Sequence, residues 1–401
     1  LLSQYGNISV MKATQRAHPM IEKALEIDPE SAEGFAALGL ARWQIGQLDA
    51  AESAMRQAVE LNEDYVPAQL WLAGILKQQG RYPEEQMVLE KAMSMDPLNE
   101  LLAVNYASSL AVSGDWESGK EMMQSLTRLR PDSTMLLRFM AMHEIQHGNL
   151  VEGWNLAHRA WQLQPDNPED ISALAKAWLL LGGFEEAEQL VLDGLEKSGQ
   201  NGNLMGVYYQ VLLVSGRLEE AQSLVLEMMQ EFGPDIPAGL QRNFDLQLGV
   251  IAMVREDFDS AYEIFSRAIN NDDSPAYSGD EILIFTMASL MSEIAGNEEE
   301  AKERLLQAER KVKRARLNGV DDPNIYYSEA VIFSMRDDPE RALEKLNLAY
   351  ENGFRERWLV ELDGRLDPIR ERVEFVTFKN QLDDDISQAL AEVRSAPMAL
   401  L

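Results

Sequence analysis

The chain contains no cysteine among its 401 residues and only four histidines. The lack of cysteine excludes disulfide bonds, thiolate metal sites and cysteine nucleophiles. It is compatible with a reducing or an oxidising compartment, and it slightly favours an oxidising one, where a stray thiol is a liability. With four histidines, few general acid–base pairs can be assembled.

Long apolar runs are also absent. A membrane-spanning helix needs about 18 or more apolar residues, and the segment VYYQVLLV (207–214) is only about half as long. Because no apolar run is long enough, we expect no membrane insertion of this segment. We also expect no signal peptide at the start of the given sequence. The sequence begins at Leu1 and not at a methionine, and we therefore expect that an upstream part was removed by processing or by cloning.

Positive charge is scarce. The chain has 36 basic and 67 acidic side chains, which gives a formal net charge of −31. Such a surface repels phosphate backbones and anionic lipid head groups. We therefore expect no nucleic-acid partner for this segment, and a neutral or cationic protein partner instead.

What the chain does have is an internal period of 34 residues. Its most regular mark is a set of six glycines at that spacing: Gly46, Gly80, Gly114, Gly148, Gly182 and Gly216. Small residues accompany the first glycine seven positions before it, five after it and twelve after it, at Gly39, Ala51 and Ala58. Small or adaptable residues fill most of the matching positions in the later repeats, which predicts close packing of two segments around each glycine.

The period predicts pairs of helices. Apolar residues at helical spacing lead up to each glycine, which ends one helix and opens a tight turn. A second helix follows, and in three repeats a proline stops it, at Pro97, Pro131 and Pro165. Neither helix can bury its apolar stripe alone, so neighbouring pairs must stack. The sequence therefore predicts an all-α fold, an α-solenoid.

The period resembles the tetratricopeptide repeat, most fully in AEGFAALGLARWQIGQLDAAESAMRQAVELNEDY (32–65). The resemblance implies a right-handed superhelix of antiparallel helix pairs. We expect a truncated N-terminal repeat over 1–31 and six regular repeats over 32–235. After a slip of the register through PDIPAG (234–239), we expect three degenerate helix pairs over 236–355 and a helical cap over 356–401.

The tail is similar to the segment that closes tetratricopeptide arrays in many bacterial signalling and transcription-regulator proteins. The likeness rests on Gly353, Phe354, Leu366, Asp367, Pro368, Phe375 and Phe378. It implies the C-terminal part of a larger bacterial regulator, in the cytoplasm or the periplasm. The physical role we expect for this cap is to cover the last apolar helix face.

The stretch HEIQH (143–147) matches the His-Glu-x-x-His signature of zinc peptidases. His147 directly precedes Gly148, so the motif is also the ordinary end of the first helix of a repeat. A third ligand would have to come from His158, since the metzincin continuation is missing. A structural role is the preferred interpretation; a metal bound by His143, His147 and His158 is the alternative.

The stretch ERKVKRARL (309–317) is the one basic run. We interpret it as the end of a long solvated helix, where cations complement the helix dipole. Binding of an anionic partner is the alternative.

In the tetratricopeptide family the first helix of each pair lines a concave groove. Transferred position by position, the resemblance implies a partner-binding groove formed by Leu70, Leu101, Val104, Asn105, Met135, Arg138, Met142, Ile145, Lys176, Leu179, Gln210 and Leu213. About half of such side chains would instead fill helix–helix interfaces. The family's clamp for a C-terminal carboxylate is missing, because Ala36, Leu40, Leu101 and Val104 stand where it needs polar residues and Asn105 alone matches.

These observations predict a non-enzymatic protein-interaction or sensing module without a cofactor. It would bind a peptide or helix of a partner in an apolar groove. A free-standing assembly scaffold is one alternative, and a zinc protein or metallopeptidase using His143 and His147 is the other. The sequence does not determine the oligomeric state.

Overall fold

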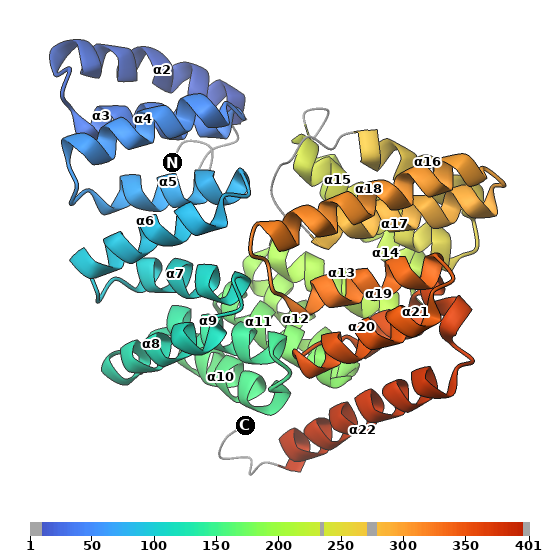
Figure 1. Cartoon of the computed structure of the whole chain (residues 1–401). Helices are drawn as coiled ribbons and strands as arrows, with labels where there is room; N and C mark the ends of the chain where they lie inside the picture. Colours follow the sequence, from blue (N-terminus) through green and yellow to red (C-terminus); the bar gives the residue numbers. More distant parts are fainter. Residues whose placement is uncertain (1–9, 233–235, 271–278, 396–401) are drawn as a thin grey trace. The chain divides into compact units, whose positions relative to one another are not determined.

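The computed structural model describes residues 10–232, 236–270 and 279–395, and this part of the chain is helical without a strand (Figure 1). The predicted register slip at 234–239 falls partly outside the described residues. The helices of the first half are α2 (Val10–Ile27), α3 (Ala32–Gln44), α4 (Leu48–Leu61), α5 (Val66–Gln78), α6 (Tyr82–Met95), α7 (Glu100–Val112), α8 (Trp116–Leu129), α9 (Thr134–Gln146), α10 (Leu150–Leu163), α11 (Pro168–Leu181) and α12 (Phe184–Ser198). Those of the second half are α13 (Gly202–Val214), α14 (Leu218–Phe232), α15 (Ala238–Val254), α16 (Phe258–Asn270), α17 (Gly279–Ile294), α18 (Glu298–Leu317), α19 (Pro323–Met335), α20 (Pro339–Glu351), α21 (Arg357–Leu362), the 3₁₀ helix η1 (Gly364–Ile369) and α22 (Val373–Ser395).

The turns have the chemistry that the period predicts. All six period glycines have positive φ, between 70° and 82°, a backbone region that favours glycine. The helices that precede Pro97, Pro131 and Pro165 each end two residues before the proline. Consecutive helices pack in pairs, such as α3 with α4 and α9 with α10. The predicted all-α solenoid is therefore confirmed.

The chain divides into two compact units. Unit 1 contains the helices up to Leu126, with the short stretch Ala315–Val320, and unit 2 contains the other described residues. In unit 1 the core contains small and larger apolar side chains, among them Ala51, Met55 and Leu76, which are fully buried. Within each unit, stacked helix pairs bury stripes that a single pair would leave in water.

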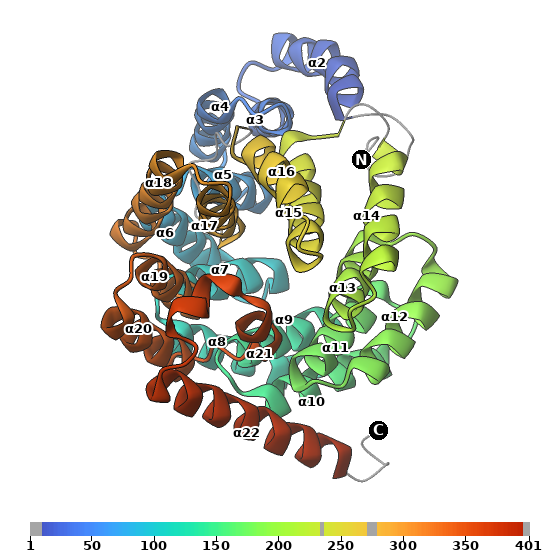
Figure 2. The same ribbon diagram turned by 90° about the vertical axis from the view of Figure 1, so that its right-hand side faces the viewer.

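Unit 2 closes on itself through its last helix. α22 packs against α20, as expected of a cap, but also against α10 and α11 (Figure 2). One core cluster joins Trp154 and Leu174 of these early helices to Phe378 and Leu382 of α22. At the far end of α22, Arg394 donates a hydrogen bond of 2.7 Å to Glu186 of α12, 208 residues earlier.

The paired helices α9 and α10 approach closely at Gly153, five residues after a period glycine, so a larger residue there should disturb their packing. A Cβ on Gly153 would lie 2.4 Å from Cγ1 of Ile145 and 2.9 Å from the backbone oxygen of Ala141. We expect Gly153→Ala to destabilise unit 2 by about 1–3 kcal/mol, because backbone and packed side chain must move apart. Hydrogen exchange of the α9 and α10 amides measures the loss.

Gly206 is the matched control, since it lies inside α13 with no atom within 4 Å of its Cβ position. There the same substitution should stabilise the protein by about 0.5–1 kcal/mol through helix propensity and lower chain entropy. Equal effects of the two substitutions would contradict the close packing around Gly153.

In the described part of the chain, no helix combines the length and the apolar character that crossing a membrane requires.

Candidate functional site

Four of the predicted groove residues belong to unit 1. Leu101 on α7 is 49% exposed, a large value for a leucine of this helix, and Leu70, Val104 and Asn105 are half-buried. The Asn105 side chain donates a hydrogen bond of 2.8 Å to the carbonyl of Leu101, one turn earlier. The unit 1 members therefore form a partly open, mainly apolar set on α5 and α7.

The eight members in unit 2 are less accessible. The half-buried ones are Met135, Arg138, Met142, Lys176 and Gln210. The other three, Ile145, Leu179 and Leu213, are at most 5% exposed and belong to the core. These three side chains contribute to packing and present no open surface to a partner.

Arg138 has a partner that the sequence did not indicate. Its guanidinium donates to Asp170, a fully buried carboxylate 32 residues later on α11. Burial raises the pKa of Asp170, and the neighbouring Arg138 opposes that rise. Burial also lowers the pKa of Lys176, with Glu169 opposing. Both cationic residues of the predicted groove, Arg138 and Lys176, are thus half-buried in unit 2.

The 34-residue register shows that one position changes its environment along the chain. In the first three repeats it holds Trp43, Lys77 and Ala111, of which Lys77 is exposed and the others are half-buried. In the next three repeats it holds Ile145, Leu179 and Leu213, all of which are buried. In unit 2 the side chains at this position therefore belong to the core.

The chain's own tail lies there. We call residues Gly353–Leu366 the inner segment; it joins α20 to η1 and includes α21. Phe354, Val360 and Leu366 belong to the same buried cluster as Ile145 and Leu179. Trp358 packs against the cluster that contains Leu213. In unit 2, Ile145, Leu179 and Leu213 thus share their buried clusters with residues of the inner segment, and Ile145 also packs against Gly153 of α10.

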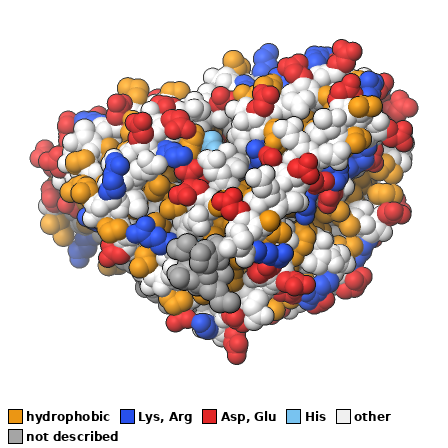
Figure 3. Space-filling model, turned by 90° about the horizontal axis from the view of Figure 1, so that it is seen from below, with side chains coloured by type: hydrophobic (Ala, Val, Ile, Leu, Met, Phe, Trp, Pro, Cys, Tyr) orange, Lys and Arg blue, Asp and Glu red, His pale blue; other side chains and the backbone are white. Residues whose placement is uncertain are grey.

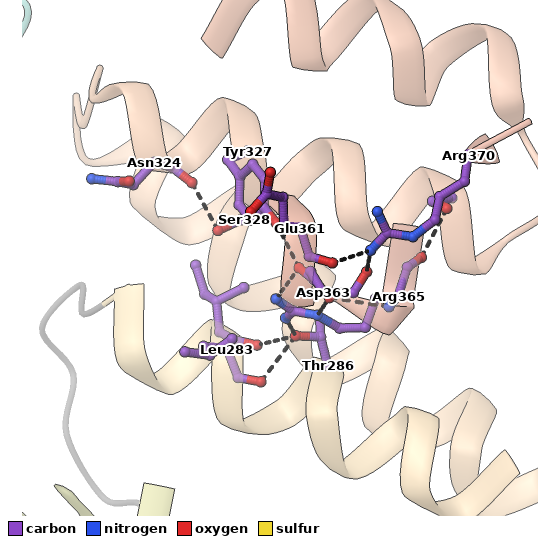
Figure 4. Close-up of polar contacts among 11 residues, drawn as sticks. Leu283, Thr286, Asn324, Tyr327, Ser328, Glu361, Asp363, Arg365 and Arg370 are labelled. Atoms are coloured by element: carbon purple, nitrogen blue, oxygen red, sulfur yellow. Dashed lines mark hydrogen bonds and ion pairs between the residues drawn. The ribbon is translucent and has the colours of Figure 1, made fainter. Parts of the chain in front are cut away.

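A buried polar network fixes the end of the inner segment (Figure 4). Asp363 and Arg365, 1% and 3% exposed, form a bidentate pair, with Nε of Arg365 2.7 Å from Oδ1 of Asp363. The hydroxyl of Tyr327 donates to Asp363 at 2.6 Å, and Arg365 donates to Thr286 of α17. Burial raises the pKa of Tyr327 well above its usual value, so the hydroxyl stays a donor. The network ties η1 to α17 and α19.

The HEIQH residues are placed as parts of a helix end. The ring of His143 lies 4.2 Å from that of Phe139, and Nδ1 of His147 lies 2.8 Å from the carbonyl oxygen of His143. Glu144 is buried and accepts a hydrogen bond of 2.7 Å from Asn149, which opens the next helix. His158 stacks on Trp154, at 4.7 Å between the rings. Among the described residues, no three His, Asp or Glu side chains form a group that could hold a metal ion.

The basic run lies at the end of α18, as expected of a solvated helix end. Lys311 forms an ion pair of 3.0 Å with Glu281, while Lys313 and Arg314 are exposed. The face drawn in Figure 3 intersperses acidic and basic side chains and shows no continuous basic area.

Comparison with known proteins agrees with this architecture. A family model described as tetratricopeptide repeat matches residues 14–65 and 36–92. The small glutamine-rich tetratricopeptide repeat-containing protein 2 of Mycosarcoma maydis is 34% identical over 87 residues, which are 22% of this chain and 25% of that protein. The chain thus matches about a quarter of that relative's length.

Two solved structures show the likeness over longer spans. A human IFIT1 dimer with m7Gppp-AAAA is similar over 74% of this chain and 78% of its own, with 13% identity and a TM-score of 0.50. The Cut9–Hcn1 hetero-tetramer of APC/C covers 93% of this chain and 83% of its own, with 11% identity and a TM-score of 0.49.

The matched family model covers the first repeats, and the same 34-residue register with its positive-φ glycines continues to Gly216. Residues 14–92 of the chain therefore match the tetratricopeptide repeat family.

Proposed function

We propose that this chain is a protein-interaction scaffold that binds a segment of a partner protein on the inner helices of unit 1. Tetratricopeptide repeat proteins typically act in this way and typically are not enzymes. The observation that supports unit 1 as the binding surface is Leu101. It is half exposed at a position of α7 that faces the groove in the family.

Unit 2 is the weaker candidate for this role. Its members Ile145, Leu179 and Leu213 are buried together with the inner segment. In unit 1, by contrast, Leu70, Val104 and Asn105 remain half-buried around α5 and α7. A partner that adds apolar contacts to these side chains would complete their burial, and each fully buried aliphatic side chain contributes about 1.5–3 kcal/mol.

Charge narrows the chemistry of the partner. A net charge of −31 favours association with a neutral or cationic segment and raises the association rate of a cationic one. We therefore propose an apolar segment flanked by basic residues. The affinity should fall as salt is raised, because exposed charges are screened over about 8 Å at physiological ionic strength.

The test is a paired substitution within unit 1. Leu101→Glu places a charge on the inner helix α7, whereas Met87→Glu places the same charge on α6, where the native methionine is 69% exposed. We expect the amount of a partner recovered with the wild type to fall at least tenfold with Leu101→Glu and to stay unchanged with Met87→Glu. Affinity purification followed by mass spectrometry, with circular dichroism as the folding check, measures this.

Recovery of the same proteins by all three chains would reject the inner surface of unit 1. A protein identified in this way should then be cut to a peptide, and that peptide should bind the purified wild type with the same preference. Failure of every apolar, basic-flanked peptide would reject the proposed chemistry while leaving the surface intact.

The wider setting stays a proposal. The tail's likeness to bacterial regulators supports a place within a larger bacterial regulatory protein, and a free-standing scaffold is the alternative. A reading frame that extends far upstream of Leu1 supports the first. Zinc binding by His143 and His147 gains no support from the geometry, since His143 packs on Phe139. Zinc bound in a one-to-one ratio and lost on substitution of His143 or His147 would support this alternative.

A further inference from the structure

The inner segment crosses successive repeats at equivalent points. A Cβ on Gly148 would lie 3.1 Å from the guanidinium carbon of Arg355, and one on Gly182 would lie 3.0 Å from Nη2 of Arg357. Gly148 and Gly182 are 34 residues apart and occupy the same turn of neighbouring repeats. Two arginines separated by one residue therefore approach two equivalent turns.

The approach of backbone to backbone is close at the start of this crossing. Gly353 has φ +108°, and a Cβ there would lie 2.4 Å from the backbone of His147. Residues between the end of α20 and the start of α21 are not helical. Trp358 then reaches the core cluster of α13, α14 and α15. The stretch Gly353–Trp358, which ends in the first turn of α21, therefore contacts three repeats in succession.

The chemistry of these contacts explains why arginine occurs there. Each turn glycine follows the C-terminus of a first helix, α9 or α11, which is the partially negative end of the helix dipole. The Arg355 guanidinium itself donates to the carbonyl oxygens of Tyr350 and Phe354. A glycine has no side chain to keep a guanidinium away. From the other side, α22 provides two carboxylates: Asp385 lies 3.6 Å from Arg355 and Asp383 lies 3.8 Å from Arg357.

We propose that Gly353–Trp358 is an internal ligand of unit 2. It occupies a binding surface of α9–α13 that takes a non-helical stretch running into the first turn of a helix, with two arginines separated by one residue and followed by tryptophan. A partner segment with the same order of side chains replaces it. This surface is formed by other helices than the proposed surface on α5 and α7. The scaffold would therefore have a second binding site, which its own inner segment occupies.

The test uses the full chain and a labelled peptide, GFRERWLVELDG, which copies residues 353–364. Arg357→Ala combined with Trp358→Ala weakens the internal ligand and leaves the surface of α9–α13 unchanged. We expect the peptide to bind this variant at least tenfold more tightly than the wild type in fluorescence anisotropy. The peptide with both arginines replaced by glutamate should bind neither chain.

Arg372→Ala is the matched control, because Arg372 is exposed and lies beyond the inner segment. It should bind the peptide no better than the wild type. If the double variant proves unfolded by circular dichroism, Arg357→Ala alone, at a side chain 28% exposed, should give a smaller gain in the same direction. Equal binding by the wild type and the variants, or equal binding of the glutamate peptide, would overturn the proposal. Neither outcome depends on Leu101, so the two binding proposals can fail independently.

Discussion

Replacing Arg365 by methionine is expected to destabilise unit 2 by about 3–5 kcal/mol, because it leaves the Asp363 carboxylate buried without its counter-charge. Both side chains of the pair are at most 3% exposed. Thr286 and Tyr327 also lose part of their hydrogen-bonded network. Urea unfolding followed by hydrogen exchange of the α17 and α19 amides measures the loss where the network lies.

Arg341→Met is the matched control for this prediction. Arg341 pairs with Asp338, but its side chain is 60% exposed, and exposed pairs contribute about 0–1 kcal/mol. A combined Asp363→Leu, Arg365→Met variant should recover part of the loss, because an apolar pair leaves no buried charge. Similar losses for Arg365→Met and Arg341→Met would show that the Asp363–Arg365 pair is not isolated from water.

Glu85 is expected to make unit 1 less stable as the pH rises. It is 3% exposed on α6, and burial raises the pKa of its carboxyl from 4.5 to about 7, with Lys77 opposing. The folded chain therefore holds this proton more tightly than the unfolded chain. The stability is complete below about pH 4.5 and is lost as the pH passes through 7.

Glu85→Gln should remove this dependence. Its advantage over the wild type should be close to zero at pH 4.5 and grow to about 3 kcal/mol at pH 8. Hydrogen exchange of the α5 and α6 amides, compared between the two chains at each pH, reports on this region. An advantage that does not change with pH would place the Glu85 carboxylate in contact with water.

The repeat pattern shows that Glu85 is unusual at its position. Glu85 occupies the small position that holds Ala51, Gly119, Gly153 and Ala187 in other repeats. The period therefore marks Glu85 as unusual, but the sequence does not tell whether its side chain leaves the interface or stays buried. The structure places it in the interface.

The helix pairs could be predicted because their determinants are local. A glycine that needs positive φ and a proline that ends a helix act within a few residues. The glycine recurs in all six repeats and the proline in three of them. The surroundings of Ile145, Leu179 and Leu213 could not be predicted. Their apolar character predicts burial, but burial by a partner and burial within the chain would select the same apolar residues.

The buried pair was missed for a related reason. Asp363 and Arg365 lie in a segment without a repeat, so no second copy shows which of its charges point inward. Asp170 was missed because its partner Arg138 lies one repeat away, and the two are joined only when α9 and α11 stack.

The closure of unit 2 has a consequence for synthesis on the ribosome. An open solenoid can fold pair by pair as it emerges, since each repeat needs only its neighbours. Here α10 and α11 complete their core with Phe378, Leu382 and Ile386, which are made about 200 residues later. Until translation reaches α22, the apolar face around Trp154 is open to chaperones and to other nascent chains, and a product that stops short of Phe375 keeps that face uncovered.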